Sequence, residues 1–129
     1  FNTQSYTSIL KEDVEFLGRV SDAQLADLYA NATSFVFPSL YEGFGIPPLE
    51  AQYFGCPVIA SNAASLPEVL SDSVLYFNPH SSSEIKDAMI KVSNDLNLRE
   101  KLIECGYKNL KKYSWGDSAS KLLSIINKI

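Results

Sequence analysis

The sequence predicts an α/β fold in which helices cover both faces of a parallel sheet, followed by a helical C-terminus. Short apolar runs typical of buried strands alternate with helix patterns as far as residue 83, and only helix patterns follow. The length of 129 residues indicates one domain. A hydrophobic content of 46% and a charged content of 20% are ordinary for a globular protein.

The first elements are expected between residues 4 and 32. Residues 4–12 have a weak helix pattern, and residues 14–17 are typical of a strand. Ser21 and Gln24 fit a capping box, so a helix should begin at Asp22. Its apolar positions follow helical spacing and give it one apolar face: Leu25, Leu28, Tyr29 and Ala32.

A strand, a glycine-rich loop and a helix are expected between residues 34 and 55. The apolar run 34–37 suits a strand covered on both faces, and Pro38 ends it because proline has no N–H for the ladder. A helix is expected over residues 48–54, since Pro48 suits the first helical position. That start places Glu50 in the first turn, near the positive end of the helix dipole.

Two further strands and four helix starts complete the pattern. The strands are expected over 57–60 and 73–77. Serine or asparagine caps, each with an acidic residue three positions on, indicate the helix starts at Ser65, Ser81, Asn97 and Ser114. Ligands of parallel sheets bind at the carboxyl ends of the strands, so three loops should form one pocket rim: residues 18–20, 38–45 and 61–65.

The net charge of −4 argues against a general nucleic-acid binder. The charge is uneven, with a balance of −8 over residues 1–100 and +4 over residues 101–129. The basic C-terminal helix fits a membrane surface or a partner, although a solvated helix face is the simpler explanation.

The cysteines and the single histidine offer no catalytic arrangement. Cys56 and Cys105 have no metal-ligand spacing and are expected to be reduced, buried thiols. His80 follows Asn78-Pro79 and is expected to be a turn residue rather than a base. The residues therefore predict no metal site.

The loop after strand 34–37 matches no common nucleotide fingerprint. It lacks the third glycine of the dinucleotide pattern and the Gly-Lys-Ser/Thr of a P-loop. A phosphate there would depend on backbone N–H groups, while Glu42 and Glu50 could accept hydrogen bonds from sugar hydroxyls. From spacing alone the alternative is favoured, in which Glu50 only caps its helix and Glu42 is a solvated carboxylate.

Residues 38–51 read Pro-Ser-Leu-Tyr-Glu-Gly-Phe-Gly-Ile-Pro-Pro-Leu-Glu-Ala. This string resembles the E-x7-E signature of the group 1, or family-4 type, retaining glycosyltransferases of GT-B fold. Similarity to the family extends over nearly the whole chain, through residues 14–22, 55–61, 66–69, 77–79 and 113–115. The resemblance implies a Rossmann-like C-terminal domain that binds a nucleotide-sugar donor.

The resemblance also implies a role for each site residue. Glu42 would be the catalytic carboxylate that contacts the transferred sugar, and Glu50 would bind the ribose hydroxyls. The backbone of Arg19 and Val20 would contact the base. The N–H groups of the glycine loop would meet the sugar and the diphosphate, from Gly43, Phe44, Gly45 and Ile46. No metal or other cofactor is implied.

The implied activity is hexosyl transfer with retention of configuration, in polysaccharide biosynthesis. Tyr41 and Pro47-Pro48 are typical of members that use GDP-mannose, which favours a mannosyltransferase. The acceptor would be a glycan or a lipid bound by an N-terminal domain. The implied location is cytoplasmic, with peripheral contact at the inner face of a membrane as an option.

Nothing before Val14 resembles the family's first strand or its cationic Gly-Arg-…-Lys segment. We therefore expect residues 1–129 to be a partial donor domain, which lacks the first strands and has no transferase activity in isolation. An alternative is a non-catalytic module that binds nucleotides or a partner subunit. A hydrolase using Glu42 and Glu50 is a third alternative.

Overall fold

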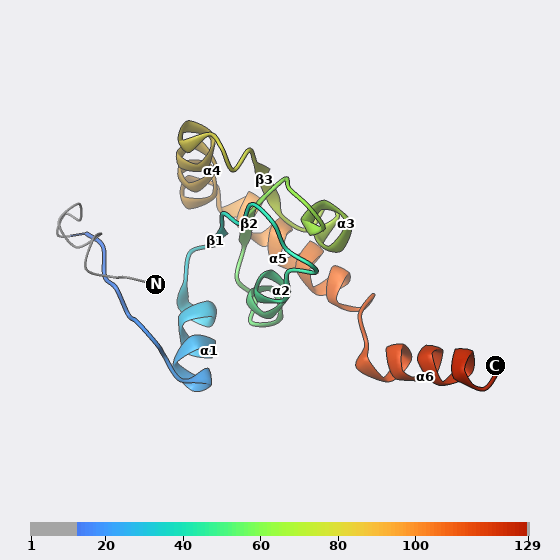
Figure 1. Cartoon of the computed structure of the whole chain (residues 1–129). Coiled ribbons are helices and arrows are strands. Elements are labelled where there is room, and N and C mark those ends of the chain that lie inside the picture. The colour runs from blue at the N-terminus through green and yellow to red at the C-terminus, as the bar shows by residue number, and fades with distance from the viewer. Residues whose placement is uncertain (1–12, 129) are drawn as a thin grey trace.

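The computed structural model describes residues 13–128, so the helix expected over 4–12 lies outside the described residues. Six helices and three strands occur there (Figure 1): α1 Asp22–Asn31, β1 Phe35–Phe37, α2 Ile46–Tyr53, β2 Val58–Ser61, α3 Leu66–Leu70, β3 Leu75–Phe77, α4 Ser82–Asn94, α5 Leu96–Leu110 and α6 Trp115–Ile126. The order alternates strand and helix and then ends in helices, as the sequence predicts.

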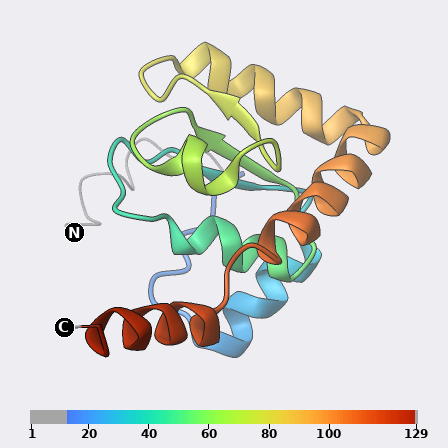
Figure 2. The same ribbon diagram turned by 90° about the vertical axis from the view of Figure 1, so that its right-hand side faces the viewer.

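The three strands form one parallel sheet in the order β1-β2-β3, with Val36 beside Ile59 and Ile59 beside Leu75. Every residue of the central strand β2 is buried. Parallel sheets need cover on both faces, and Figure 2 shows α4 on one side of the sheet with α2 and α1 on the other. The predicted α/β arrangement is confirmed.

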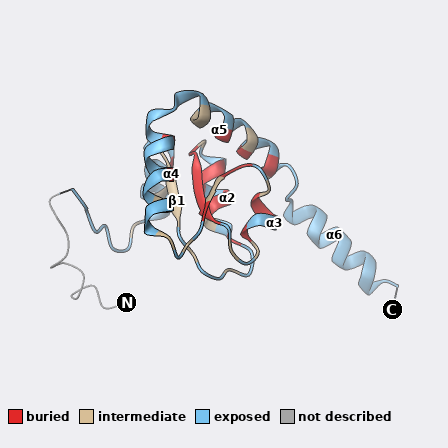
Figure 3. Ribbon diagram, turned by 90° about the horizontal axis from the view of Figure 1, so that it is seen from above, coloured by how far each residue is buried: buried red, intermediate tan, exposed pale blue. Residues whose placement is uncertain are grey.

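The core is divided by the sheet because successive side chains of a strand point to opposite faces. Val58 and Ala60 pack in the cluster that holds Leu49 of α2 and Val69 of α3. Ile59 packs in the other cluster, which joins β3, α4 and α5 through Phe77, Ala88, Val92 and Leu102. Figure 3 shows the buried residues gathered around the sheet, with α6 exposed along its length.

The predicted strand over residues 14–17 is wrong. These residues are irregular, and Val14, Phe16 and Leu17 are about half exposed, at 55%, 55% and 49%. A strand needs a neighbour for its backbone N–H and C=O groups. Among residues 13–128 the sheet contains β1, β2 and β3 alone, and none of them pairs with this segment.

The predicted caps are confirmed at three helix starts and wrong at two. Ser21, Ser81 and Ser114 each accept a hydrogen bond from the backbone N–H three residues on. Asp95, rather than Asn97, caps α5, because its carboxylate lies 2.9 Å from the N–H of Leu98. Ser65 makes no capping hydrogen bond, since its hydroxyl binds a backbone carbonyl 23 residues away in sequence.

Candidate functional site

The glycine loop, residues 38–45, leaves the carboxyl end of β1 and leads into α2. Its last residue, Gly45, has a φ of +91°, a left-handed conformation that L side chains rarely adopt. A Cβ at this position would also lie only 2.6 Å from Cδ2 of the buried Leu66 side chain. Gly45 is therefore required both for its backbone angle and for the close packing of the loop on α3.

Glu42 is half-buried and is held at two of its atoms. The Ser39 hydroxyl donates to Oε1 of the Glu42 carboxylate at 2.9 Å. The Ser65 hydroxyl donates to the backbone carbonyl oxygen of Glu42, also at 2.9 Å. The predicted catalytic carboxylate is thus oriented by one serine, while its backbone is fixed by another.

Four consecutive backbone N–H groups follow Glu42, and the structure gives them no acceptor among the residues it describes: Gly43, Phe44, Gly45 and Ile46. Gly43 has no other residue within 4 Å of the position that a Cβ would occupy. Consecutive free N–H groups form a concave site for an anion. This part of the loop has the chemistry of a phosphate-binding or oxyanion-binding site.

The predicted start of α2 at residue 48 is wrong, because the helix begins about half a turn earlier, at Ile46. Glu50 therefore lies further from the helix start than predicted. Gly45 is the N-cap and α2 begins at Ile46, so the two prolines occupy the second and third helical positions. The first turn contains no acidic residue. Proline has no N–H, so Pro47 and Pro48 remove two of the four free donors at the helix start. An anion at this site would therefore be bound mainly by the N–H groups of the loop, and less by those of the helix start.

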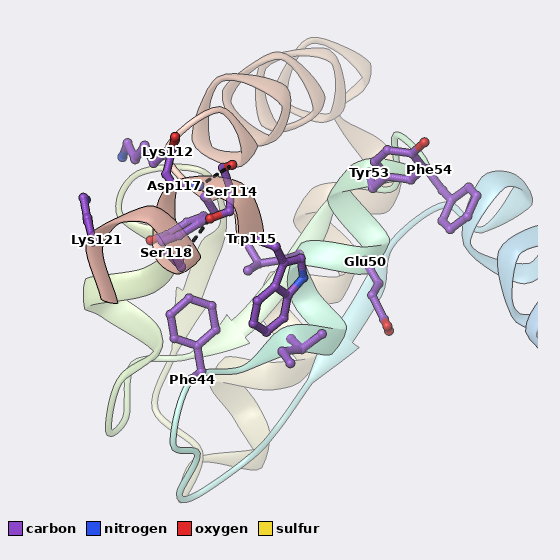
Figure 4. A pocket seen from close by; sticks show the side chains of 13 residues that line it. Phe44, Glu50, Tyr53, Phe54, Lys112, Ser114, Trp115, Asp117, Ser118 and Lys121 are labelled. Carbon is purple, nitrogen blue, oxygen red and sulfur yellow. Dashed lines mark hydrogen bonds between the residues drawn. The ribbon is translucent and has the colours of Figure 1, made fainter. Parts of the chain in front are cut away.

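Glu50 lies in the second turn of α2 and is exposed. In Figure 4 its carboxylate points away from the Trp115 ring. Burial chiefly raises the pKa of Tyr29 in α1, and the nearby negative charge of Glu50 raises it further. The carboxylate is therefore available to hydrogen-bond donors of a ligand, on the side of α2 that faces α1.

Arg19 and Val20 precede α1, where Arg19 is exposed and Val20 is half-buried. In the described part of the chain, no hydrogen bond or ion pair joins either residue to the glycine loop. Of the three predicted rim loops, the structure links residues 38–45 and 61–65 through Ser65 and Glu42. It does not link residues 18–20 to them.

A pocket of about 770 Å³ lies between the glycine loop, α2 and α6 (Figure 4). Its lining is mostly apolar and comes from two stretches of the sequence, 44–54 and 112–121: Phe44, Ile46, Leu49, Glu50, Tyr53, Phe54, Lys112, Tyr113, Ser114, Trp115, Asp117, Ser118 and Lys121. Phe44 meets Tyr113 edge to face, with ring centroids 5.4 Å apart. The sequence patterns gave these C-terminal residues no role, although residues 113–115 stood out as similar to the family.

The two cysteines and the histidine lie outside the glycine loop. Cys56 is buried and Cys105 half-buried, and neither forms a disulfide. Burial raises the pKa of the Cys56 thiol to about 11, so this thiol is protonated at neutral pH. His80 lies in a turn, where its backbone N–H donates a hydrogen bond to Oδ1 of Asn78. Residues 13–128 contain no group of three His, Cys, Asp or Glu side chains that could hold a metal ion.

Comparison with known proteins identifies the family. The profile described as "Glycosyl transferases group 1" matches residues 1–109, and the chain belongs to this family. The chain is 39% identical over 111 residues to an O-antigen chain mannosyltransferase B of Escherichia coli, which covers 86% of this chain and 29% of that protein. It therefore spans less than a third of that relative's length.

Two solved structures have the same fold. Sucrose-phosphate synthase from Thermosynechococcus elongatus aligns with a TM-score of 0.82 and 26% identity, over 97% of this chain and 32% of that one. The C-terminal domain of the group 1 glycosyl transferase LpcC from Francisella tularensis aligns with a TM-score of 0.69 and 31% identity, over 84% of this chain and 58% of that one. The resemblance to group 1 glycosyltransferases is confirmed. Among the described helices, none is long and apolar enough to span a membrane.

Proposed function

We propose that the glycine loop and α2 bind the nucleotide-sugar donor of a retaining hexosyltransferase, and that this chain is a partial donor domain. The observation that carries the proposal is the pairing of a fixed carboxylate with a row of free amides. Glu42 is held by Ser39 and Ser65, and the four N–H groups after it have no protein acceptor among the described residues. A nucleotide sugar presents the matching groups: a polyhydroxylated ring beside a diphosphate.

Each site residue then has a chemical task. Glu42 accepts hydrogen bonds from the transferred sugar, while the N–H groups of Gly43 to Ile46 bind the sugar and the diphosphate. The exposed Glu50 carboxylate accepts from the two ribose hydroxyls, a contact typical of an acidic residue in nucleotide-binding folds. The backbone of Arg19 and Val20 contacts the base. The proposal includes no metal, and it assigns the diphosphate charge to the loop amides.

The reaction proceeds on one face of the donor sugar. The acceptor hydroxyl attacks the anomeric carbon on the face that the diphosphate leaves, the anomeric C–O bond to phosphate breaks, and the leaving phosphate takes the acceptor's proton. Unlike the retaining hydrolases that use two carboxylates, the enzyme forms no covalent intermediate, so Glu42 orients the sugar and is not a nucleophile. The fixed N–H groups at the phosphate stabilise the negative charge that develops on the leaving group.

The favoured donor is GDP-mannose. Tyr41 and Pro47-Pro48 favour it, and the similar E. coli protein is named a mannosyltransferase. The acceptor, a glycan or a lipid, binds outside residues 1–129, so these residues alone transfer no sugar. The cytoplasmic location and the peripheral membrane contact stay predictions.

Calorimetric titration with GDP and UDP tests the donor site. The wild-type chain should bind a nucleoside diphosphate, with GDP the tighter, and Glu50→Ala should weaken binding about tenfold, because hydrogen bonds to a charged group contribute about 1.5–3 kcal/mol. Glu100→Ala is the matched control, since Glu100 is an exposed carboxylate on α5. Equal affinities for wild type and Glu50→Ala would contradict the ribose-binding role.

A further inference from the structure

We propose that Ser65 is a positioning residue of this site, which holds the Glu42–Gly43 peptide so that the Gly43 N–H faces the donor. The inference rests on the proposed donor site and adds a residue from a different loop. The Ser65 hydroxyl lies 2.9 Å from the carbonyl oxygen of Glu42, and the contact is partly shielded from water.

The planarity of the peptide bond gives this contact its effect. The carbonyl of Glu42 and the N–H of Gly43 belong to one rigid plane, and in a trans peptide they point in opposite directions. The chain has no cis peptide bond among its described residues. A hydroxyl that fixes the carbonyl toward the start of α3 therefore turns the Gly43 N–H away from α3.

Gly43 needs such a constraint because a glycine backbone restricts its own conformation very little. Glycine has the widest range of φ and ψ angles, so an unheld glycine peptide would rotate among several orientations. An N–H group that becomes fixed only when the ligand binds costs conformational entropy at that step, whereas an N–H group that is already fixed does not. The Ser65 contact removes this cost at Gly43, the first of the four amides that have no acceptor among the described residues.

Helix α3, which begins directly after Ser65, is itself held in place by hydrogen bonds. Tyr76 donates its hydroxyl to the carbonyl of Ser71 at 2.8 Å, and Tyr113 donates to the carbonyl of Val69 at 2.7 Å, so two tyrosines hold α3. Leu66, beside Ser65, is 1% exposed and packs directly under Gly45. The start of α3 thus contributes one hydrogen bond and one close apolar contact to the loop.

The local conformation leaves the Ser65 hydroxyl free for this task. Ser65 has helical backbone angles, with φ −77° and ψ −12°, instead of the extended angles of Ser21, Ser81 and Ser114. A helical N-cap residue does not place its hydroxyl over the next turn. The Ser-x-x-Glu pattern that suggested a cap therefore supports the neighbouring loop.

The test combines calorimetry with 15N NMR of the Gly43 amide, in wild type, Ser65→Ala and Ser65→Thr. Ser120→Ala is the control, because Ser120 is exposed and is not among the residues that line the pocket beside the loop. Ser65→Ala should weaken GDP binding about fivefold, the effect of one hydrogen bond. It should also reduce the shift of the Gly43 cross-peak on GDP addition. Ser65→Thr and Ser120→Ala should both match wild type.

The outcomes separate the two proposals. If wild type binds GDP while Ser65→Ala keeps both the affinity and the Gly43 shift, the positioning role is wrong and the donor site stands. The positioning role is also wrong if Ser65→Thr is as impaired as Ser65→Ala. If wild type binds neither GDP nor UDP, the proposed donor site is wrong, and the role of Ser65 is overturned with it. A thermal unfolding curve of each variant shows that the fold is intact.

Discussion

Helices α5 and α6 have similar sequence patterns but different surroundings. α5 buries Leu102, Gly106 and Asn109, which recur at helical spacing on one face, against the sheet and α2. α6 has an equally regular apolar face, yet none of its residues is buried, and Trp115 is 87% exposed. Apolar periodicity therefore predicts a helix and its apolar face, but not whether another element covers that face.

Close packing and buried polar contacts distinguish the covered helix. The Gln52 amide of α2 donates to the Ser73 hydroxyl at 2.6 Å, and the Asn109 amide of α5 donates to the carbonyl of Val69 at 3.1 Å. All three side chains are almost fully buried. The oxygen of the Asn109 amide has no hydrogen-bond partner among the described residues. Within residues 13–128, no buried side-chain hydrogen bond of this kind joins α6 to another helix or strand.

The largest expected effect comes from a pair of leucines. Leu102 of α5 is 6% exposed and Leu122 of α6 is 59% exposed. Leu102→Ala should lower the free energy of unfolding by about 3 kcal/mol, since it leaves a cavity in the core. Leu122→Ala should change it by less than about 0.5 kcal/mol. Chemical denaturation measures both, and equal losses would mean that α6 is covered in solution.

A pair of glycines gives a smaller contrast. A Cβ at Gly106 would lie 3.0 Å from Cγ of Gln52, whereas at Gly116 of α6 it would lie 3.6 Å from the Ser114 hydroxyl. Gly106→Val should therefore destabilise the protein by about 2 kcal/mol through overpacking. Gly116→Val should leave the unfolding free energy within about 0.5 kcal/mol of wild type. A harmless Gly106→Val would show that α2 and α5 separate easily.

The smallest effect concerns pH. Burial chiefly, and then the charges of Asp72 and Tyr113, raise the pKa of Tyr76 from 10.0 to about 12. Below about pH 10 the Tyr76 phenol is protonated in both the folded and the unfolded state, and its stabilising effect is complete. Between about pH 10 and 12 the phenol ionises in the unfolded state but not yet in the folded state, so the unfolding free energy falls. Tyr76→Phe should cost about 1 kcal/mol at pH 7, from the lost hydrogen bond to Ser71, and should make the alkaline fall shallower. An unchanged alkaline slope would contradict the assignment.

Elements set by local interactions could be predicted from the sequence. The caps at Ser21, Ser81 and Ser114 depend on a backbone N–H three residues away, and the strands β1 to β3 depend on continuous apolar runs. The errors involve distant partners. Residues 14–17 have strand composition without a neighbouring strand, and the hydroxyl of Ser65 binds a carbonyl that no local pattern reveals.

The candidate site shows the same division. The motif over residues 38–51 identified the family, and the structure shows how Ser39 and Ser65 hold Glu42. The predicted start of α2 at Pro48 is wrong because Gly45 is the N-cap residue. Gly45 has a left-handed backbone angle, which glycine permits but which the sequence alone does not reveal. The pocket beside α6 depends on residues about 70 positions later in the chain, which spacing rules do not connect.

The contact between Glu50 and the ribose is the central claim, and a nucleotide without ribose hydroxyls tests it most directly. Wild type and Glu50→Ala are titrated with GDP and with 2′,3′-dideoxy-GDP, with Glu100→Ala as the control. Wild type should lose about tenfold in affinity for the dideoxy nucleotide, and Glu50→Ala should bind both nucleotides with one weak affinity. If Glu50→Ala weakens both nucleotides by the same factor, Glu50 does not bind the ribose and the donor site as described here is wrong.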